Sequence, residues 1–172
     1  MEIEKIEKEQ TTKGTLTTDT DGQPLFIRED GERFRLGWDW RSDELVWCAE
    51  HSGEIFSSDR REYLTQYMVD NGKDGKHRDE HLQISAFDER DDGWLSVKAH
   101  RLIAEAWCRR TGKRRIVHHI DVQPWNNDSA NLVWVTDDEH HKLHNLWRHN
   151  LKDEYYAMVD AIRADNEING TR

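Results

Sequence analysis

The chain has 172 residues, 35% of them hydrophobic and 35% charged, with a net charge of −10 and a mean hydropathy of −1.03. This length allows one domain, or one small domain with extensions, and the composition predicts a modest core. No apolar run approaches the roughly 20 residues that a membrane span needs, and the first ten residues lack the apolar segment of a signal peptide. Cys48 and Cys108 form no CxxC motif, which argues against a cysteine zinc site and favours a reducing, cytoplasmic setting.

The N-terminal third predicts a tail followed by a small β-rich extension. Residues 1–22 are polar and rich in threonine, and we interpret them as a mobile tail. Alternating apolar and polar residues in residues 23–72 predict four strands, the first two joined by the turn dipeptide Asp30-Gly31. These strands are expected at 25–29, 32–36, 44–49 and 54–57. A helix capped by Ser57 or Ser58 is expected to run to about Val69.

Residues 73–80 are interpreted as a charged linker that leads into a second unit, residues 81–151. This unit is predicted to begin with a hairpin, at 81–87 and 94–98, and a helix over 99–110. His100 lies in that helix, where we interpret it as a packing or capping residue rather than a catalytic one. His81 belongs to no recognisable pattern.

The segment from position 115 to 148 carries the most informative pattern of the chain. A short apolar strand ends in His118-His119-Ile120, a turn-rich loop follows, and Leu132-Val133-Trp134-Val135 is suited to pair back on the first strand. Thr136 and Glu139 then match the capping box that opens a helix. The predicted order is strand, loop, strand, helix. A closing helix is expected over residues 152–164 and a loose end over residues 165–172.

The histidines of this segment have the spacing of a metal site. His140 and His144 are four residues apart, so they share one face of the predicted helix, directed towards the hairpin. His141 and His149 fall on the opposite, solvent-facing side. Two inward imidazoles one turn apart, with a third from the neighbouring strand, form a site of the kind that divalent zinc-like metals prefer.

These residues resemble the HNH nucleases of the ββα-metal class, and most closely the phage and intron-encoded homing endonucleases. The resemblance covers roughly residues 97–150, including the lead-in HRLIAEAW. It implies that His118 is a metal ligand, where many members have Asp, and that His119 is the general base. It further implies that Asn131 braces the loop and that His140 and His144 complete the metal site. The fold class expected is α+β, a ββα-metal motif with a small N-terminal β-rich extension.

The resemblance implies DNA, expected to be double-stranded, as partner, although the chain is acidic. Between positions 98 and 118, however, seven basic residues face one acidic residue. Such an island can hold a phosphate backbone, or it can be a solvated helix end that complements the helix dipole. The candidate DNA-binding residues are Arg101, Arg109, Arg110, Lys113, Arg114 and Arg115. The extension over residues 23–72 is expected to be a scaffold, with a DNA-recognition module as the alternative.

The expected function is therefore hydrolysis of DNA phosphodiester bonds with one divalent ion, for which Zn, Mg, Mn and Ni stay open. An intracellular protein encoded by a phage or mobile element would fit this activity. The alternative is a structural zinc site in a catalytically inactive DNA-binding or interaction protein, which would need four ligands. A toxin or anti-phage effector would share the nuclease chemistry.

Overall fold

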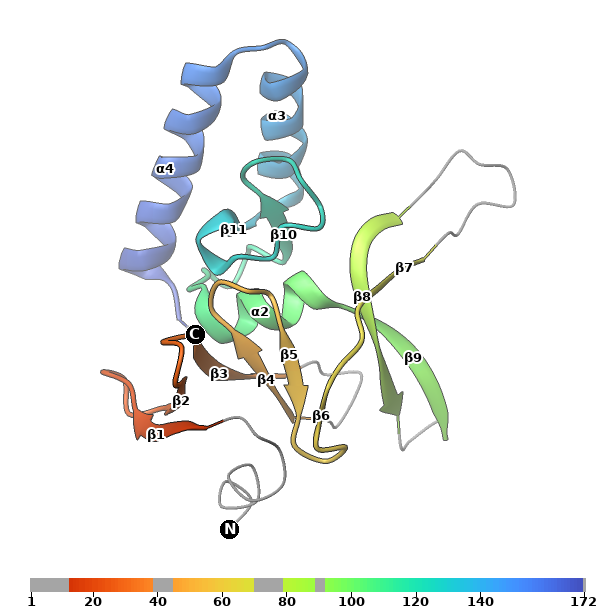
Figure 1. The fold of residues 1–172 in the computed structure, drawn as a ribbon. Coiled ribbons are helices and arrows are strands. Elements are labelled where there is room, and N and C mark those ends of the chain that lie inside the picture. The colour runs from red at the N-terminus through yellow and green to blue at the C-terminus, as the bar shows by residue number, and fades with distance from the viewer. Residues whose placement is uncertain (1–12, 39–44, 70–78, 89–91, 172) are drawn as a thin grey trace.

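The computed structural model describes residues 13–38, 45–69, 79–88 and 92–171, and it has the α+β architecture expected (Figure 1). The strands are β1 (Gly14–Thr18), β2 (Pro24–Arg28), β3 (Arg33–Trp38), β4 (Leu45–Ala49), β5 (Ile55–Ser57), β6 (Glu62–Tyr63), β7 (Tyr67–Val69), β8 (Asp79–Asp88), β9 (Gly93–Lys98), β10 (Ile116–His119) and β11 (Leu132–Val135). The helices are α2 (Ala99–Trp107), α3 (Asp137–Arg148), α4 (Lys152–Asn169) and the 3-10 turn η1 (Ser129–Asn131). No helix among the described residues is long and apolar enough to cross a membrane.

The first six strands form one antiparallel sheet in sequence order. The four predicted strands correspond to β2 to β5, and Gly31 takes the positive φ of 90° that the tight β2–β3 turn requires. Residues 14–18, expected within the mobile tail, instead form β1, which pairs along its whole length with β2. The prediction of a mobile tail is therefore wrong for residues 14–18. Their alternating Thr and Leu residues form the edge strand of the six-stranded sheet. Residues 1–12 lie outside the described part.

The helix expected from position 57 to 69 is wrong. The chain turns at Arg61, whose φ is 59°, and β6 pairs back on β5 while β7 joins another sheet. The physical reason is burial of aromatic rings. Tyr63 packs edge-on against Phe56, with ring centroids 5.3 Å apart, and a helix would take it away from that contact.

A second antiparallel sheet consists of β7, β8 and β9 and leads into α2. The predicted hairpin at 81–87 and 94–98 is found as β8 and β9. Most of the linker predicted at 73–80 lies outside the described residues. The α2 helix ends at Trp107, three residues before the expected end, and it contacts β3 and β4 of the first sheet and β8 of the second.

The predicted order of strand, loop, strand and helix is found between positions 116 and 148. The β10 and β11 strands pair antiparallel, with His118 opposite Val133 and His119 opposite Leu132. The capping box opens α3: the Thr136 side chain accepts from the Glu139 amide, and the Glu139 carboxylate accepts from the Thr136 amide. The α4 helix then packs antiparallel beside α3 (Figure 1).

The α4 helix is longer than expected, because it continues to Asn169 where a loose end was predicted from position 165. Asn166, which is 3% exposed, explains the extension. Its side-chain amide donates to the Trp134 carbonyl and its side-chain oxygen accepts from the Thr111 amide. These bonds hold the last turns of α4 against β11.

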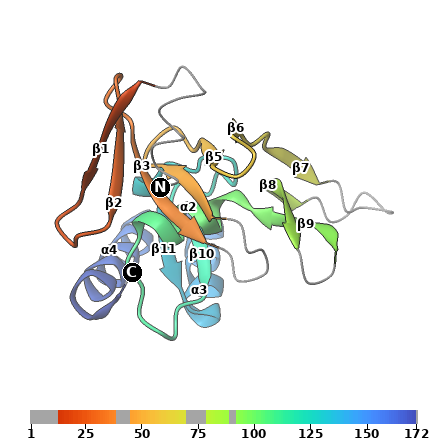
Figure 2. The same ribbon diagram turned by 90° about the horizontal axis from the view of Figure 1, so that it is seen from below.

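The α2 helix lies at the centre of the molecule, between the N-terminal sheet and the β10–β11 hairpin (Figure 2). One core cluster combines Val46 and Cys48 of the sheet with Ile103 of α2 and Trp134 of β11. Gly37 permits the close approach, because a Cβ at this position would lie 2.7 Å from the Leu102 carbonyl oxygen. The extension and the hairpin therefore share one hydrophobic core.

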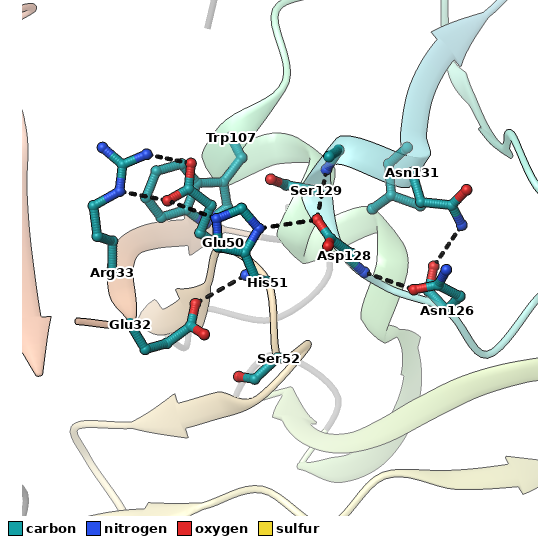
Figure 3. Close-up of polar contacts among 12 residues, drawn as sticks. Glu32, Arg33, Glu50, His51, Ser52, Trp107, Asn126, Asp128, Ser129 and Asn131 are labelled. Carbon is teal, nitrogen blue, oxygen red and sulfur yellow. Dashed lines mark hydrogen bonds and ion pairs between the residues drawn. The ribbon is translucent and has the colours of Figure 1, made fainter. Parts of the chain in front are cut away.

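Polar contacts reinforce this junction at the turn between β4 and β5 (Figure 3). The His51 Nδ1 atom lies 3.2 Å from the Asp128 carboxylate, and the Ser129 amide donates to the Glu50 carbonyl at 2.8 Å. Gly53 packs on the same loop, since a Cβ there would lie 3.3 Å from the Cβ of Asn127. The N-terminal sheet thereby supports the loop between β10 and β11.

Candidate metal centre and base

The structure brings together the three histidines expected as metal ligands. His118 comes from β10, while His140 and His144 come from one face of α3. One ring nitrogen from each lies within 4.8 Å of the others, and the Nε2 atoms of His140 and His144 are 3.2 Å apart. His141 and His149 are exposed, as expected from the helix phase.

The Tyr155 hydroxyl on α4 determines which nitrogen of His118 can bind a cation. This hydroxyl donates to the Ile120 carbonyl at 2.7 Å and lies 2.8 Å from His118 Nε2. Because a carbonyl oxygen only accepts and the hydroxyl has one proton, Nε2 must carry a proton and donate to Tyr155. The lone pair of a neutral His118 is then on Nδ1. Metal-ligating histidines characteristically donate their other nitrogen in this way.

The imidazoles of this cluster are held in the neutral form. Burial, reinforced by the neighbouring histidines, lowers the pKa of His118 to about 3 and that of His140 to about 4. Burial also lowers the pKa of His144. Since only the unprotonated ring binds a metal, protons do not compete for the site at neutral pH.

The donor set fits a divalent transition-metal ion. With metal–nitrogen bonds of about 2.0–2.1 Å, two ligands of a tetrahedral site lie about 3.3 Å apart, close to the separation of the His140 and His144 nitrogens. Among the described residues, the group of His, Cys, Asp and Glu side chains close enough to share this ion has three members. Three protein ligands leave a position for water or substrate, as in catalytic rather than structural zinc sites.

His119 follows His118 on β10 and therefore points to the opposite face of the hairpin. It is 5% exposed, and its Nε2 atom lies 3.1 Å from the Asn127 side-chain oxygen. An amide oxygen only accepts, so Nε2 carries the proton and Nδ1 keeps the lone pair. Burial lowers the pKa of His119, partly offset by the Asn127 hydrogen bond, and the ring is a neutral proton acceptor.

Asn131 braces the loop between the two strands. Its side-chain oxygen accepts from the Asp121 amide at 2.9 Å, and its amide group donates to the Asn126 carbonyl at 2.9 Å and to the Asp121 carboxylate at 2.8 Å. Burial acts to raise the pKa of Asp121, but hydrogen bonds led by that from Asn126 lower it. The loop is thus closed on itself by three side chains.

Sequence reasoning missed four residues at this site. Asn127 holds the base and Tyr155 holds His118, while His81 and His100 lie against His119, with ring centroids 5.4 and 5.0 Å from it. The adjacent asparagines at 126 and 127 were a signal for Asn127. Nothing in the local sequence pointed to the other three, because each lies on a different element.

The basic island is mostly engaged within the protein. Arg114, a candidate DNA-binding residue, is 8% exposed and lies between α3 and α4, where it pairs with Glu139 at 2.7 Å and with Asp165. The hydrogen bond between the two side chains raises the pKa of Arg114 and lowers the pKa of Glu139. Arg114 therefore does not lie on the surface as expected, since the capping-box carboxylate of α3 draws it inward.

The other arginines of the island are partly engaged. Arg101 donates to the Arg115 carbonyl, Arg110 lies over the Trp134 ring at 4.9 Å, and Arg109 faces Asp21 at 3.6 Å. The side chains of Lys113 and Arg115 are exposed, and no ion pair to either is found within the described ranges. These two are the cations of the island that are best placed for an external phosphate.

No family model and no curated protein sequence matches this chain. Among solved structures, the chain is similar to one described as "DNA binding and cleavage by the HNH homing endonuclease I-HmuI", with 22% identity and a TM-score of 0.46. The similarity covers 67% of this chain and 62% of that chain. At this level of similarity, the neighbour establishes neither the family nor the activity of this protein. Both must be argued from the side chains of this protein's own site.

Proposed function

We propose that this protein is a divalent-metal-dependent endonuclease of the HNH type, which hydrolyses phosphodiester bonds in DNA. One observation carries the proposal. His118 at the end of β10 belongs to a three-histidine cluster with an open position. The next residue, His119, is a neutral histidine that can act as a base. A phosphodiester hydrolase needs both groups, whereas a packed core needs neither.

His118, His140 and His144 would hold the ion, and when bound it would supply positive charge beside the scissile phosphate and its 3′-oxygen leaving group. His119 accepts a proton from the attacking water at Nδ1, because Nε2 already donates to Asn127. The water oxygen bonds to phosphorus as the bond to the 3′-oxygen breaks. Asn131 keeps the loop, and with it Asn127, in register with the base.

The DNA contacts nearest the site are assigned to Lys113 and Arg115. Both lie in the turn that precedes β10 and both are exposed. Arg114 between them is given a structural role, because its guanidinium joins α3 to α4. The N-terminal sheet of β1 to β6 is assigned as a scaffold, since it shares a core with α2 and supports the loop that carries Asn127.

The structural-zinc alternative is disfavoured by the same geometry. A structural zinc site is closed by four protein ligands. In the part of the chain that the structure describes, the group around His118 has three members. The adjacent His119 is turned to the other face and bonded to Asn127, so it does not supply the fourth.

A plasmid assay tests the function. The metal-stripped chain is incubated with supercoiled plasmid and one molar equivalent of Zn, Ni or Co, or an excess of Mn or Mg, each with and without EDTA. We expect cleavage that EDTA abolishes and that His119→Ala reduces to background. A chain that binds zinc tightly but cuts no plasmid under any ion would reject the nuclease and favour the structural site.

A further inference from the structure

The structure contains a second group of three histidines, on the other face of β10. His81 of β8 and His100 of α2 converge on His119, and their ring nitrogens also lie within 4.8 Å of one another. The ring centroids are separated by 4.6, 5.0 and 5.4 Å. In the cluster of His118, His140 and His144 the separations are 4.5, 5.0 and 5.4 Å. The two triangles have almost the same dimensions.

The nitrogens of the second group are suited to bind a cation. The Nε2 atom of His119 donates to Asn127, which leaves the Nδ1 lone pair unused, as the Tyr155 contact does for His118. His100 is 4% exposed, and its Nδ1 atom is buried with no hydrogen-bond partner among the described residues. A buried polar atom without a partner is unfavourable, and an ion bound there would satisfy it.

The protonation state agrees with this geometry. Burial, together with the neighbouring His81 and His119, lowers the pKa of His100 well below its usual value. The His100 ring is therefore neutral at physiological pH, which is the form that binds metals.

We infer that His81, His100 and His119 form a second metal site, selective for imidazole-preferring ions such as Zn, Ni and Co. Three nitrogen donors without a carboxylate suit these ions and not Mg, which requires oxygen ligands. An ion at this site occupies the lone pair of His119. If His119 is the base of the proposed nuclease, then the second ion inhibits cleavage, and that consequence alone rests on the proposed function.

Zinc stoichiometry tests the site without reference to activity. The full-length, metal-stripped chain is titrated with zinc by calorimetry, and bound metal is counted after equilibrium dialysis. Wild-type protein should bind two zinc ions per chain, whereas His81→Ala and His100→Gln should each bind one. His141→Ala is the matched control, because this exposed histidine belongs to neither group, and it should bind two.

Circular dichroism and thermal melting verify that each variant is folded. His81 is partly exposed on a strand, so His81→Ala decides the question if His100→Gln does not fold. The inference is overturned if wild-type protein binds one zinc ion that His144→Ala loses and His81→Ala keeps. It is also overturned if both His81→Ala and His100→Gln still bind two.

A cleavage assay against zinc then separates the two ideas. Wild-type cleavage should rise to one zinc equivalent and fall with the second, and in His81→Ala the fall should disappear relative to that variant's own maximum. A chain that binds two zinc ions as described but never cuts DNA would reject the nuclease and keep the second site. A chain that cuts DNA but binds one zinc ion would reject the second metal site and keep the nuclease.

Discussion

The two histidine clusters have the same ring geometry but different access to solvent. In the cluster of His118, His140 and His144, only His118 is buried, and the other two, on α3, are partly exposed. In the cluster of His81, His100 and His119, both His100 and His119 are buried, and His81 is partly exposed. The proposed catalytic ion therefore belongs to the more open first cluster. The proposed inhibitory ion belongs to the more enclosed second cluster, which contains the proposed base His119.

The two clusters also differ in the sequence distance that they span. The first is built within one strand–loop–strand–helix unit, from position 118 to 144. The second joins three elements from position 81 to 119 and needs the packing of α2 against β8. Because β10 contributes adjacent residues to opposite faces, a single strand serves both. Variants on either face should therefore have separable effects.

The largest expected effect is on catalysis, from the residue next to the first cluster. His119→Ala should lower the rate of plasmid cleavage by ~10²-fold or more, the range for loss of a general base. The first zinc equivalent should still bind, because His118, His140 and His144 are untouched. Single-turnover cleavage and calorimetry on one preparation measure both. Parallel loss of cleavage and of the first zinc ion would place His119 in the first metal shell.

Removal of a ligand from the first cluster should weaken metal binding more than any neighbouring change. His144→Ala should lower the affinity for the first zinc ion by more than the roughly 10- to 100-fold that loss of a supporting partner costs. His141→Ala should leave this affinity unchanged, because His141 lies on the exposed side of α3. Calorimetric titration compares them. Equal effects of the two substitutions would show that the assigned phase of α3 is incorrect.

The hydroxyl and amide that orient the two strand histidines should act on different clusters. Tyr155→Phe removes the acceptor for His118 Nε2 and should weaken the first zinc ion by about 10-fold, with the ring packing retained. Asn127→Ala removes the acceptor for His119 and should slow cleavage while the first zinc ion binds normally. Zinc titrations and cleavage rates for both variants test the separation. Identical profiles would mean that the two clusters behave as one.

The smallest effect concerns DNA held beside the open cluster. Lys113→Ala with Arg115→Ala should lower the magnitude of the salt slope, log K against log salt, by up to ~2, since each neutralised phosphate contributes about −0.9. Binding should weaken similarly on all sequences, and zinc affinity should be unchanged. Fluorescence anisotropy from low salt upwards measures the slope. An unchanged slope would locate the DNA contacts elsewhere, such as the sheets formed by β1 to β9.

Arg114 provides the contrast within the same island. Arg114→Met should leave the salt slope unchanged and lower the free energy of unfolding by roughly 2–3 kcal/mol, as expected when hydrogen bonds to a charged group are lost. The affected bonds join Arg114 to Glu139, Asp165 and Asn166. Urea denaturation measures the change. A variant of normal stability with a reduced slope would return Arg114 to the DNA-binding surface.

Several parts of the fold were predictable because their signals are local. The turn at Asp30-Gly31, the hairpin of β8 and β9, and the capping box at Thr136 each depend on residues a few positions apart. The helix expected over 57–69 failed because Tyr63 is used in an aromatic contact with Phe56, which helical periodicity cannot reveal. β1 was missed for a related reason, since a short polar strand is defined by its partner β2.

By itself, the sequence predicted that His140 and His144 share one face of α3, because helix periodicity needs no knowledge of other elements. The resemblance to HNH nucleases implied His118 as the third ligand and His119 as the base. Only the tertiary structure decided the rest. It brought Tyr155 to His118, and His81 and His100 to His119. These residues lie on different elements, so no periodic pattern in the sequence relates their positions. It also withdrew Arg114 from the surface, because its guanidinium pairs with the carboxylates of Glu139 and Asp165 between α3 and α4. Residue spacing determines which side chains share a face of one helix or strand. Contacts between elements depend on tertiary packing, which residue spacing does not determine.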